Sequence, residues 1–111
     1  MSIDRQAWQH HSHRGEDRYV VALRGELDIG VVEDLHELLT ATIAHAPLIE
    51  IDLAAVTFID STVISTLISA HHRATAAGAR LSVSNTTGHV HRVLDMTGVL
   101  PILSTDPTPI D

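Results

Sequence analysis

The sequence predicts a single α/β domain with a mixed β-sheet of about four to five strands and helices packed mainly on one face. The 111 residues suit one compact domain, and 44% of them are apolar, which is enough for a core. Segments of β-branched or alternating apolar residues are separated by segments whose apolar residues recur every three or four positions. The resulting order is β-β-α-β-α-β-α-β, and strands joined through helices favour parallel pairing.

The first two elements are predicted to form an antiparallel hairpin. A mixed polar and apolar segment, Ile3–Ser12, precedes a turn over Arg14–Asp17, in which Gly15 is free to adopt a positive φ. Arg18–Arg24 is β-branched and apolar, which is typical of a strand. Gly25–Asp28 is then expected to be a loop. The hairpin adds an antiparallel edge to parallel strands, which makes the sheet mixed.

The middle of the chain alternates between helix and strand patterns. A helix over about Val31–Ala44 is predicted because its apolar residues recur at spacings of three and four, with acids on the other side. Leu48–Leu53 alternates apolar and acidic residues, as half-buried strands do. A break is expected at Ala54-Ala55 before the strand extends toward Phe58-Ile59.

The last part of the domain repeats this alternation. Val63–Ala77 is predicted to be a helix with Val63 on its apolar stripe, and its β-branched start must be stabilised by burial rather than by propensity. Ala79–Ser84 is a strand, and Thr87 is expected to cap a third helix that stops at Gly98. Leu100–Leu103 is expected to be a short last strand or turn. The predicted core residues are Leu35, Leu39, Ile51, Leu53, Leu67, Ile68, Leu81, Val83, Val93 and Leu94.

The domain is expected to span residues 1–103, with a flexible tail over 104–111. The formal net charge of −7 argues against broad binding to nucleic-acid phosphates. The absence of cysteine excludes disulfides and thiol chemistry. No apolar run reaches membrane-spanning length, and the N-terminus has no apolar core of a secretory signal. These features predict a cytoplasmic protein without membrane insertion.

A polar trio interrupts an apolar stretch where a strand is expected to give way to a helix. The stretch reads FIDSTVIS and contains Asp60, Ser61 and Thr62. Asp60 suits the N-cap of the following helix, and most such trios are only caps or turns. A helix N-terminus also favours anions, and a phosphate on a hydroxyl would add about −1.5 to −2 charges at a rigid surface. The trio therefore predicts either a plain cap or a phosphorylation switch.

Other chemistries find less support in the sequence. The chain has nine histidines. His11 and His13 would share a strand face without an obvious third ligand, and His89 and His91 lack the spacing of a helical metal pair. Surface histidines and no metal site are therefore predicted. The chain has no nucleophile elbow, phosphate loop or dinucleotide fingerprint, which predicts neither an enzyme nor a cofactor. A hydrolase that uses Ser61 with a distant histidine stays an alternative without specific support.

Four blocks of sequence occur in the order found in a known family. They are VVALRGELDIG (Val20–Gly30), IEIDLAAVTFIDST (Ile49–Thr62), AHHRATAAGARLSVSN (Ala70–Asn85) and VHRVLDMTGVLPIL (Val90–Leu103). Together they resemble the stand-alone STAS domain of the anti-sigma factor antagonists, with its Gly-Glu-Leu-Asp segment and its Asp-Ser-Ser or Asp-Ser-Thr helix start. The resemblance covers nearly the whole domain, and four blocks in register are far more specific than any one of them.

The resemblance implies partner switching in a bacterial cell. Antagonists of this family bind, in their unphosphorylated form, an anti-sigma factor that is also their serine/threonine kinase, and this binding frees a sigma factor for transcription. Phosphorylation ends the binding, and a phosphatase restores it. By this resemblance Thr62 is the phosphate acceptor, with Ser61 as the alternative. The residues expected to bind the partner are Gly25, Glu26, Leu27, Asp28, Asp60, Ser61, Val63 and Ser65.

The sequence departs from the family pattern just after the acceptor. Family members usually place glycine there and often again two residues later, whereas this chain has Val63 and Ser65. Glycine lets a partner's backbone approach closely, so Val63 is expected to add bulk beside Thr62 and to hinder a kinase. The departure keeps a second reading open. In that reading the chain is a STAS docking subunit of another assembly, such as a sensory scaffold or a lipid-transport complex, without a phosphorylation switch.

Overall fold

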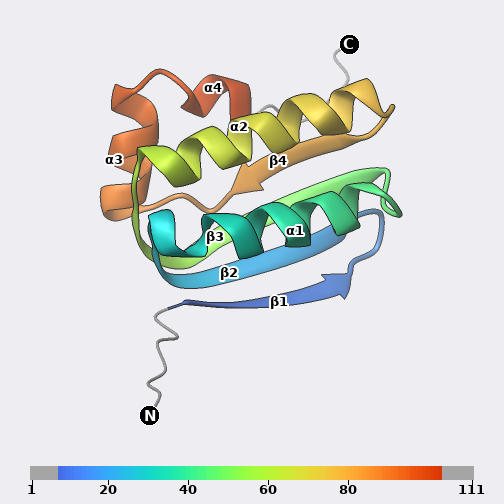
Figure 1. Ribbon diagram of the computed structural model, residues 1–111, viewed down its shortest axis with the longest axis horizontal. Helices are drawn as coiled ribbons and strands as arrows, with labels where there is room; N and C mark the ends of the chain where they lie inside the picture. Colours follow the sequence, from blue (N-terminus) through green and yellow to red (C-terminus); the bar gives the residue numbers. More distant parts are fainter. Residues whose placement is uncertain (1–7, 104–111) are drawn as a thin grey trace.

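A computed structural model describes residues 8–103, in which four strands form one sheet (Figure 1). The expectations for residues 3–7 and for the tail over 104–111 lie outside the described residues. The strands lie in the order β1-β2-β3-β4, with β1–β2 antiparallel and the pairs β2–β3 and β3–β4 parallel. Their bounds are Trp8–Arg14, Tyr19–Leu27, Leu48–Ile59 and Arg80–Ser84. The predicted hairpin and mixed sheet are confirmed.

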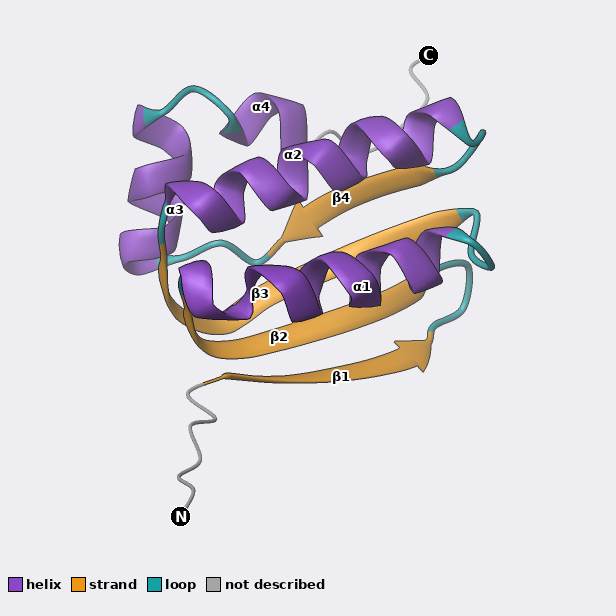
Figure 2. Cartoon of the chain, in the orientation of Figure 1, coloured by secondary structure: helices purple, strands orange, loops and turns teal. Residues whose placement is uncertain are grey.

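The helices lie mainly on one face of the sheet. Figure 2 shows α1 and α2 side by side in front of the strands, and the two helices contact each other. α3 packs on β3, and α4 contacts α2, α3 and β4. The helical elements are η1 (Ile29–Val31, a 3₁₀ turn), α1 (Val32–Ile43), α2 (Ser61–Ala76), α3 (Gly88–Met96) and α4 (Leu100–Leu103). The predicted fold class is confirmed.

The core is aliphatic and lies between the sheet and the helices. Along β3, Ile49, Ile51 and Leu53 are buried, whereas the alternating Glu50 and Asp52 are half-buried on the other face. That second face is polar: the Glu50 carboxylate accepts hydrogen bonds from the side chains of Ser84 and Arg18. The predicted core is confirmed, except that Ile68 and Val93 are half-buried at its edge.

The prediction of a loop over Gly25–Asp28 is wrong. Gly25, Glu26 and Leu27 are the last residues of β2 and pair with Val56, Phe58 and Ile59 of β3. Gly25 has φ = 99° and borders a shift in the pairing register. A glycine with positive φ serves a β-bulge as readily as a loop, so the composition of this segment did not reveal the pairing.

The expected break at Ala54-Ala55 is also wrong, because β3 is continuous. The pairing with β2 shifts twice, and each shift adds one residue to β3, between Asp52 and Ala55 and between Val56 and Phe58. Each β-bulge changes which face the following residues occupy. Val56 and Ile59 are therefore both buried although they are three residues apart.

The C-terminal segment Leu100–Leu103 is the short α-helix α4, whereas a short strand or a turn was expected. Gly98, with φ = 79°, follows the C-cap of α3 and redirects the chain. The amides of Ile102 and Leu103 then donate to the carbonyl of Val99. Pro101 is tolerated because a proline in the first turn lacks only an N–H group that would have no partner within the helix.

Candidate functional site

The start of α2 is fixed by Asp60, as the sequence predicted. Asp60 is the N-cap residue with extended backbone (φ −121°, ψ −178°). One oxygen of its carboxylate, Oδ1, accepts the backbone N–H groups of Thr62 at 3.0 Å and Val63 at 3.1 Å. These bonds satisfy two of the amides that a helix N-terminus leaves without intrahelical partners. The cap fixes the first turn of the helix.

The two hydroxyls of the trio have different surroundings. Thr62 is half-buried, and its Oγ1 donates a hydrogen bond of 2.5 Å to the same Asp60 Oδ1. Ser61 is exposed, and within residues 8–103 its side chain has no hydrogen-bond partner. The structure therefore places both candidate acceptors in the first turn, with one held by the cap and the other facing solvent.

The Asp60 carboxylate is stabilised in its charged form. The hydrogen bond from the Thr62 side chain is the largest cause that lowers the pKa of Asp60 below its ordinary value. Desolvation opposes this shift, and the backbone N–H groups of Val63, Thr62 and Ile29 add to it. Asp60 is therefore an anion that holds the start of α2, and η1 contacts this helix.

The lowered pKa predicts that Asp60 stabilises the fold more when it is ionised than when it is protonated. The stabilisation is present above the unfolded pKa of about 3.9 and is lost as the pH falls through the lower folded value. Asp60→Asn keeps a good N-cap but does not titrate, so we expect the loss of stability between about pH 5 and pH 2 to be smaller than in the parent. Asp60→Ala should cost about 0.5–2 kcal/mol at pH 7.

Urea unfolding of the three proteins across this pH range measures the effect. The Asp60→Asn variant differs from the parent at this one side chain, so the difference between these two curves isolates Asp60. Parallel curves would contradict the role assigned to the Thr62–Asp60 bond.

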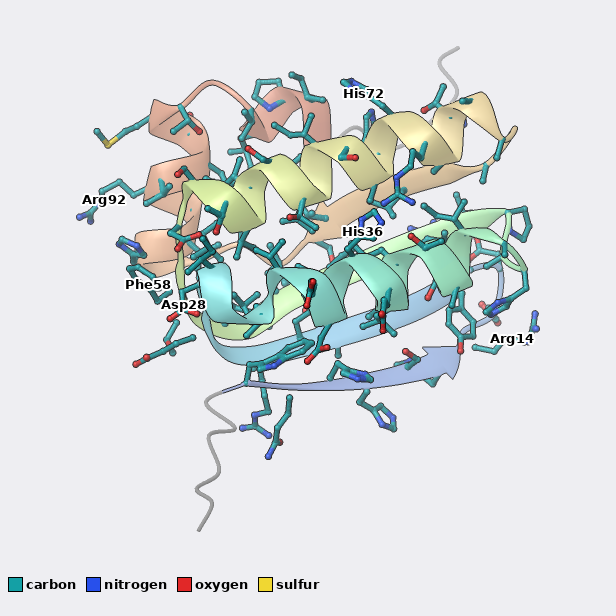
Figure 3. The ribbon with its side chains drawn as sticks, in the orientation of Figure 1. Arg14, Asp28, His36, Phe58, His72 and Arg92 are labelled. Carbon is teal, nitrogen blue, oxygen red and sulfur yellow. The ribbon has the colours of Figure 1, made fainter. Side chains whose placement is uncertain are left out.

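The structure brings the end of β2 next to the helix start. Glu26 pairs with Phe58, Leu27 pairs with Ile59, and Asp28 follows as the N-cap of η1. Figure 3 shows Asp28 and Phe58 close together at the end of the molecule where α1 and α2 begin. We call this region the α2-start surface. Its exposed or half-buried members are Gly25, Glu26, Asp28, Ile29, Phe58, Asp60, Ser61, Thr62 and Ser65.

Two residues expected to bind a partner lie instead in the core. Leu27 and Val63 are both 0% exposed, so neither side chain can contact a docked protein. Leu27 is the buried last residue of β2, and Val63 lies on the face of α2 that packs toward the sheet. The expectation that Val63 adds bulk beside Thr62 is therefore wrong.

Sequence reasoning missed two apolar members of the surface. Ile29 is 70% exposed and Phe58 is 39% exposed. The Phe58 ring stacks on His89 of α3, with ring centroids 5.3 Å apart and an interplanar angle of 7°. The apolar character of both residues favours burial, and the sequence pattern does not show that η1 and the end of β3 lie at the surface.

Neither a metal site nor a membrane-spanning helix occurs among the described residues. Among residues 8–103, no group of three or more histidine, aspartate or glutamate side chains is arranged to hold a metal ion. The helices in this same range are also too short or too polar for any of them to cross a membrane. The features that distinguish the α2-start surface are the hydroxyls of Ser61 and Thr62, its carboxylates and its two apolar side chains.

Several solved structures have the same fold. An anti-sigma factor antagonist from Mycobacterium paratuberculosis superposes with a TM-score of 0.79 at 22% identity, over 91% of this chain and 86% of that one. SpoIIAA of Bacillus in its phosphorylated form superposes with a TM-score of 0.67 at 22% identity, over 92% of each chain. A sulfate transporter family protein from Wolinella succinogenes superposes with a TM-score of 0.65 at 19% identity, over 77% of this chain and 70% of that one. These likenesses show that the chain shares its fold with these proteins.

The family follows from the sequence itself. Residues 10–103 match the family model described as "Mlab, STAS domain". The chain therefore belongs to this STAS family, and the resemblance seen in the four sequence blocks is confirmed. No curated protein matches the sequence.

Proposed function

We propose that the chain is an anti-sigma factor antagonist of the bacterial cytoplasm. In this role it binds an anti-sigma factor with serine/threonine kinase activity and so releases a sigma factor. The observation that carries the proposal is the capped start of α2, which presents Ser61 and Thr62 on a rigid surface beside Glu26 and Asp28. The fold shared with two antagonists, one of them solved in a phosphorylated form, supports it. The role requires no cofactor and no catalysis by this chain.

The Thr62–Asp60 bond gives the proposed switch a physical mechanism. In the transfer, the Thr62 oxygen bonds to the γ-phosphorus of ATP, ADP leaves, and the hydroxyl proton is lost. The phosphoester oxygen has no proton, so it cannot donate to Asp60 as the hydroxyl does. About −1.5 to −2 charges would then lie beside the Asp60 carboxylate. Repulsion and desolvation oppose docking until a phosphatase hydrolyses the ester.

Mass spectrometry tests this proposal directly. The purified chain is incubated with ATP and with each purified anti-sigma factor kinase of the source organism, and binding is measured separately without ATP. We expect one kinase to bind the parent chain and to place one phosphate on Thr62. Thr62→Ala should bind but remain unmodified, and Ser61→Ala should still be phosphorylated, because Ser61 is not the acceptor.

Two outcomes would contradict the proposal in different ways. Phosphate on Ser61 alone would move the switch to the exposed hydroxyl. Failure of every kinase to bind the parent chain would contradict the antagonist role itself.

A second candidate is a STAS docking subunit of another assembly that lacks the phosphorylation switch. Two observations favour it: the description of the matching family model names Mlab and no antagonist, and a sulfate transporter family protein shares the fold. This candidate predicts a stable complex with a non-kinase partner and no phosphate on Ser61 or Thr62. The same mass spectra, recorded beside binding data, separate the two candidates.

A further inference from the structure

Two exposed apolar side chains flank the Asp60 cap. A single exposed apolar residue is ordinary on a protein surface. Ile29 and Phe58, however, occupy the same end of the sheet as the candidate acceptors. η1, which contains Ile29, contacts α2, and Phe58 lies two residues before Asp60 in the chain. The two side chains thus belong to the surface that the proposed function assigns to docking.

The Phe58 ring and the backbone turn that carries Ile29 are both held by neighbouring groups. The Phe58 ring lies nearly parallel to His89 and is 39% exposed, so one side is supported while part of the ring stays open. Ile29 lies in η1, where the Asp28 side chain accepts the Gly30 amide at 2.9 Å and the Asp28 carbonyl accepts the Val31 amide at 3.0 Å. The Phe58 ring and the backbone that carries Ile29 are thus already ordered, which lowers the conformational entropy lost on binding.

Negative charge borders these two side chains. Glu26 pairs with Phe58 across the sheet, and Asp28 immediately precedes Ile29. Both carboxylates are exposed, and neither takes part in an ion pair within residues 8–103. Arg92 lies on the α3 side of Phe58 (Figure 3). The net charge of −7 adds a long-range preference for a cationic partner.

We propose that Ile29 and Phe58 are the apolar anchors of the partner interface. The partner surface that fits them is an apolar hollow bordered by arginine or lysine side chains, which face Glu26 and Asp28. Interfaces concentrate affinity in a few central anchors and use surrounding charges for association rate and specificity. This assignment rests on the proposed docking function and adds which residues supply affinity and what chemistry the partner presents.

Calorimetric titration of single variants tests the anchors. The probe is a purified anti-sigma factor kinase that binds the parent chain, without ATP, so that phosphorylation cannot interfere. We expect Ile29→Ala and Phe58→Ala each to weaken binding by about 10- to 100-fold. Met96→Ala is the matched control, because Met96 is 77% exposed at the far end of α3 and should leave the affinity unchanged. Thermal melting of each variant separates a loss of affinity from a loss of folding, and Phe58→Leu, which keeps apolar bulk, should bind more tightly than Phe58→Ala.

The contribution of the Glu26 and Asp28 carboxylates is measured separately, by the rate of association. The double variant Glu26→Gln, Asp28→Asn should slow association and reduce its dependence on salt concentration. Equal affinity of the parent and both anchor variants would overturn the anchors while leaving the antagonist role intact. If the double variant leaves the salt dependence unchanged, the proposal that arginine or lysine side chains of the partner face Glu26 and Asp28 is wrong. If none of the purified kinases binds the parent chain, both the proposed docking function and the assignment of the anchors are wrong.

Discussion

Replacing Thr62 with glutamate is expected to weaken partner binding by roughly 150-fold, which corresponds to about 3 kcal/mol at 1.4 kcal/mol per tenfold. The variant loses the hydroxyl that donates to Asp60 at 2.5 Å and puts a second carboxylate beside it. The added charge would face a partner surface that docks on this turn, where desolvation makes an unpaired charge costly. Glutamate in the first turn is otherwise compatible with the helix dipole, so the domain should remain folded.

Thr62→Val separates the charge from the lost hydrogen bond. Valine has nearly the same shape as threonine but neither donates nor accepts, so this variant should lose about 1 kcal/mol of stability through the missing bond to Asp60. Its affinity for the partner should stay close to that of the parent. The measurement is calorimetric titration of both variants with the kinase that binds the parent, alongside thermal melting. Equal weakening by valine and glutamate would show that charge at Thr62 is not what opposes docking.

The architecture was predictable because apolar residues recur at every second position in strands and at every third or fourth position in helices. The alternation in Leu48–Leu53 and the three-and-four spacing in α1 and α2 are local properties of the sequence. The N-cap role of Asp60 was predictable for the same reason, since a cap bonds to residues only two and three positions away. What depends on short-range chemistry was therefore visible in the sequence.

The errors concern features that depend on distant pairing. Gly25 looks like a loop residue until β3, some thirty positions later, pairs with it. The two β-bulges in β3 follow from the same pairing, and they decide that Val56 and Ile59 face inward. The exposure of Ile29 likewise depends on how η1 packs against α2, a contact between two segments that no local pattern records.

Val63 shows how two expectations from the same sequence can conflict. The apolar stripe of the predicted helix included Val63 and so indicated a core position. The resemblance to antagonists drew attention instead to the glycine that Val63 replaces, and this suggested a contact beside the acceptor. The structure agrees with the stripe, because Val63 is fully buried one residue after the half-buried Thr62. A residue next to an acceptor in sequence points about 100° away from it around a helix.

Restoring the family's glycine at this position is therefore expected to damage the fold rather than to open the site. Val63→Gly removes a side chain whose burial contributes about 1.5–3 kcal/mol, and glycine in a helix costs up to about 1 kcal/mol more. We expect the free energy of unfolding to fall by about 2–4 kcal/mol, measured by urea denaturation. Ser65→Gly is the matched control, because Ser65 is exposed in the same helix and should lose only about 0.5 kcal/mol.

The rate of phosphate transfer to Thr62 supplies the second measurement for Val63→Gly. A buried Val63 cannot obstruct a kinase, so the rate per folded molecule should not rise, and a frayed helix start should lower the affinity for the partner. Val63→Ala keeps helix propensity while removing most of the side chain, so it should lie between the parent and the glycine variant in stability. Faster phosphorylation of Val63→Gly at parental stability would contradict this account. It would mean that Val63 leaves the core when the partner binds, and that the first turn of α2 rearranges in the complex.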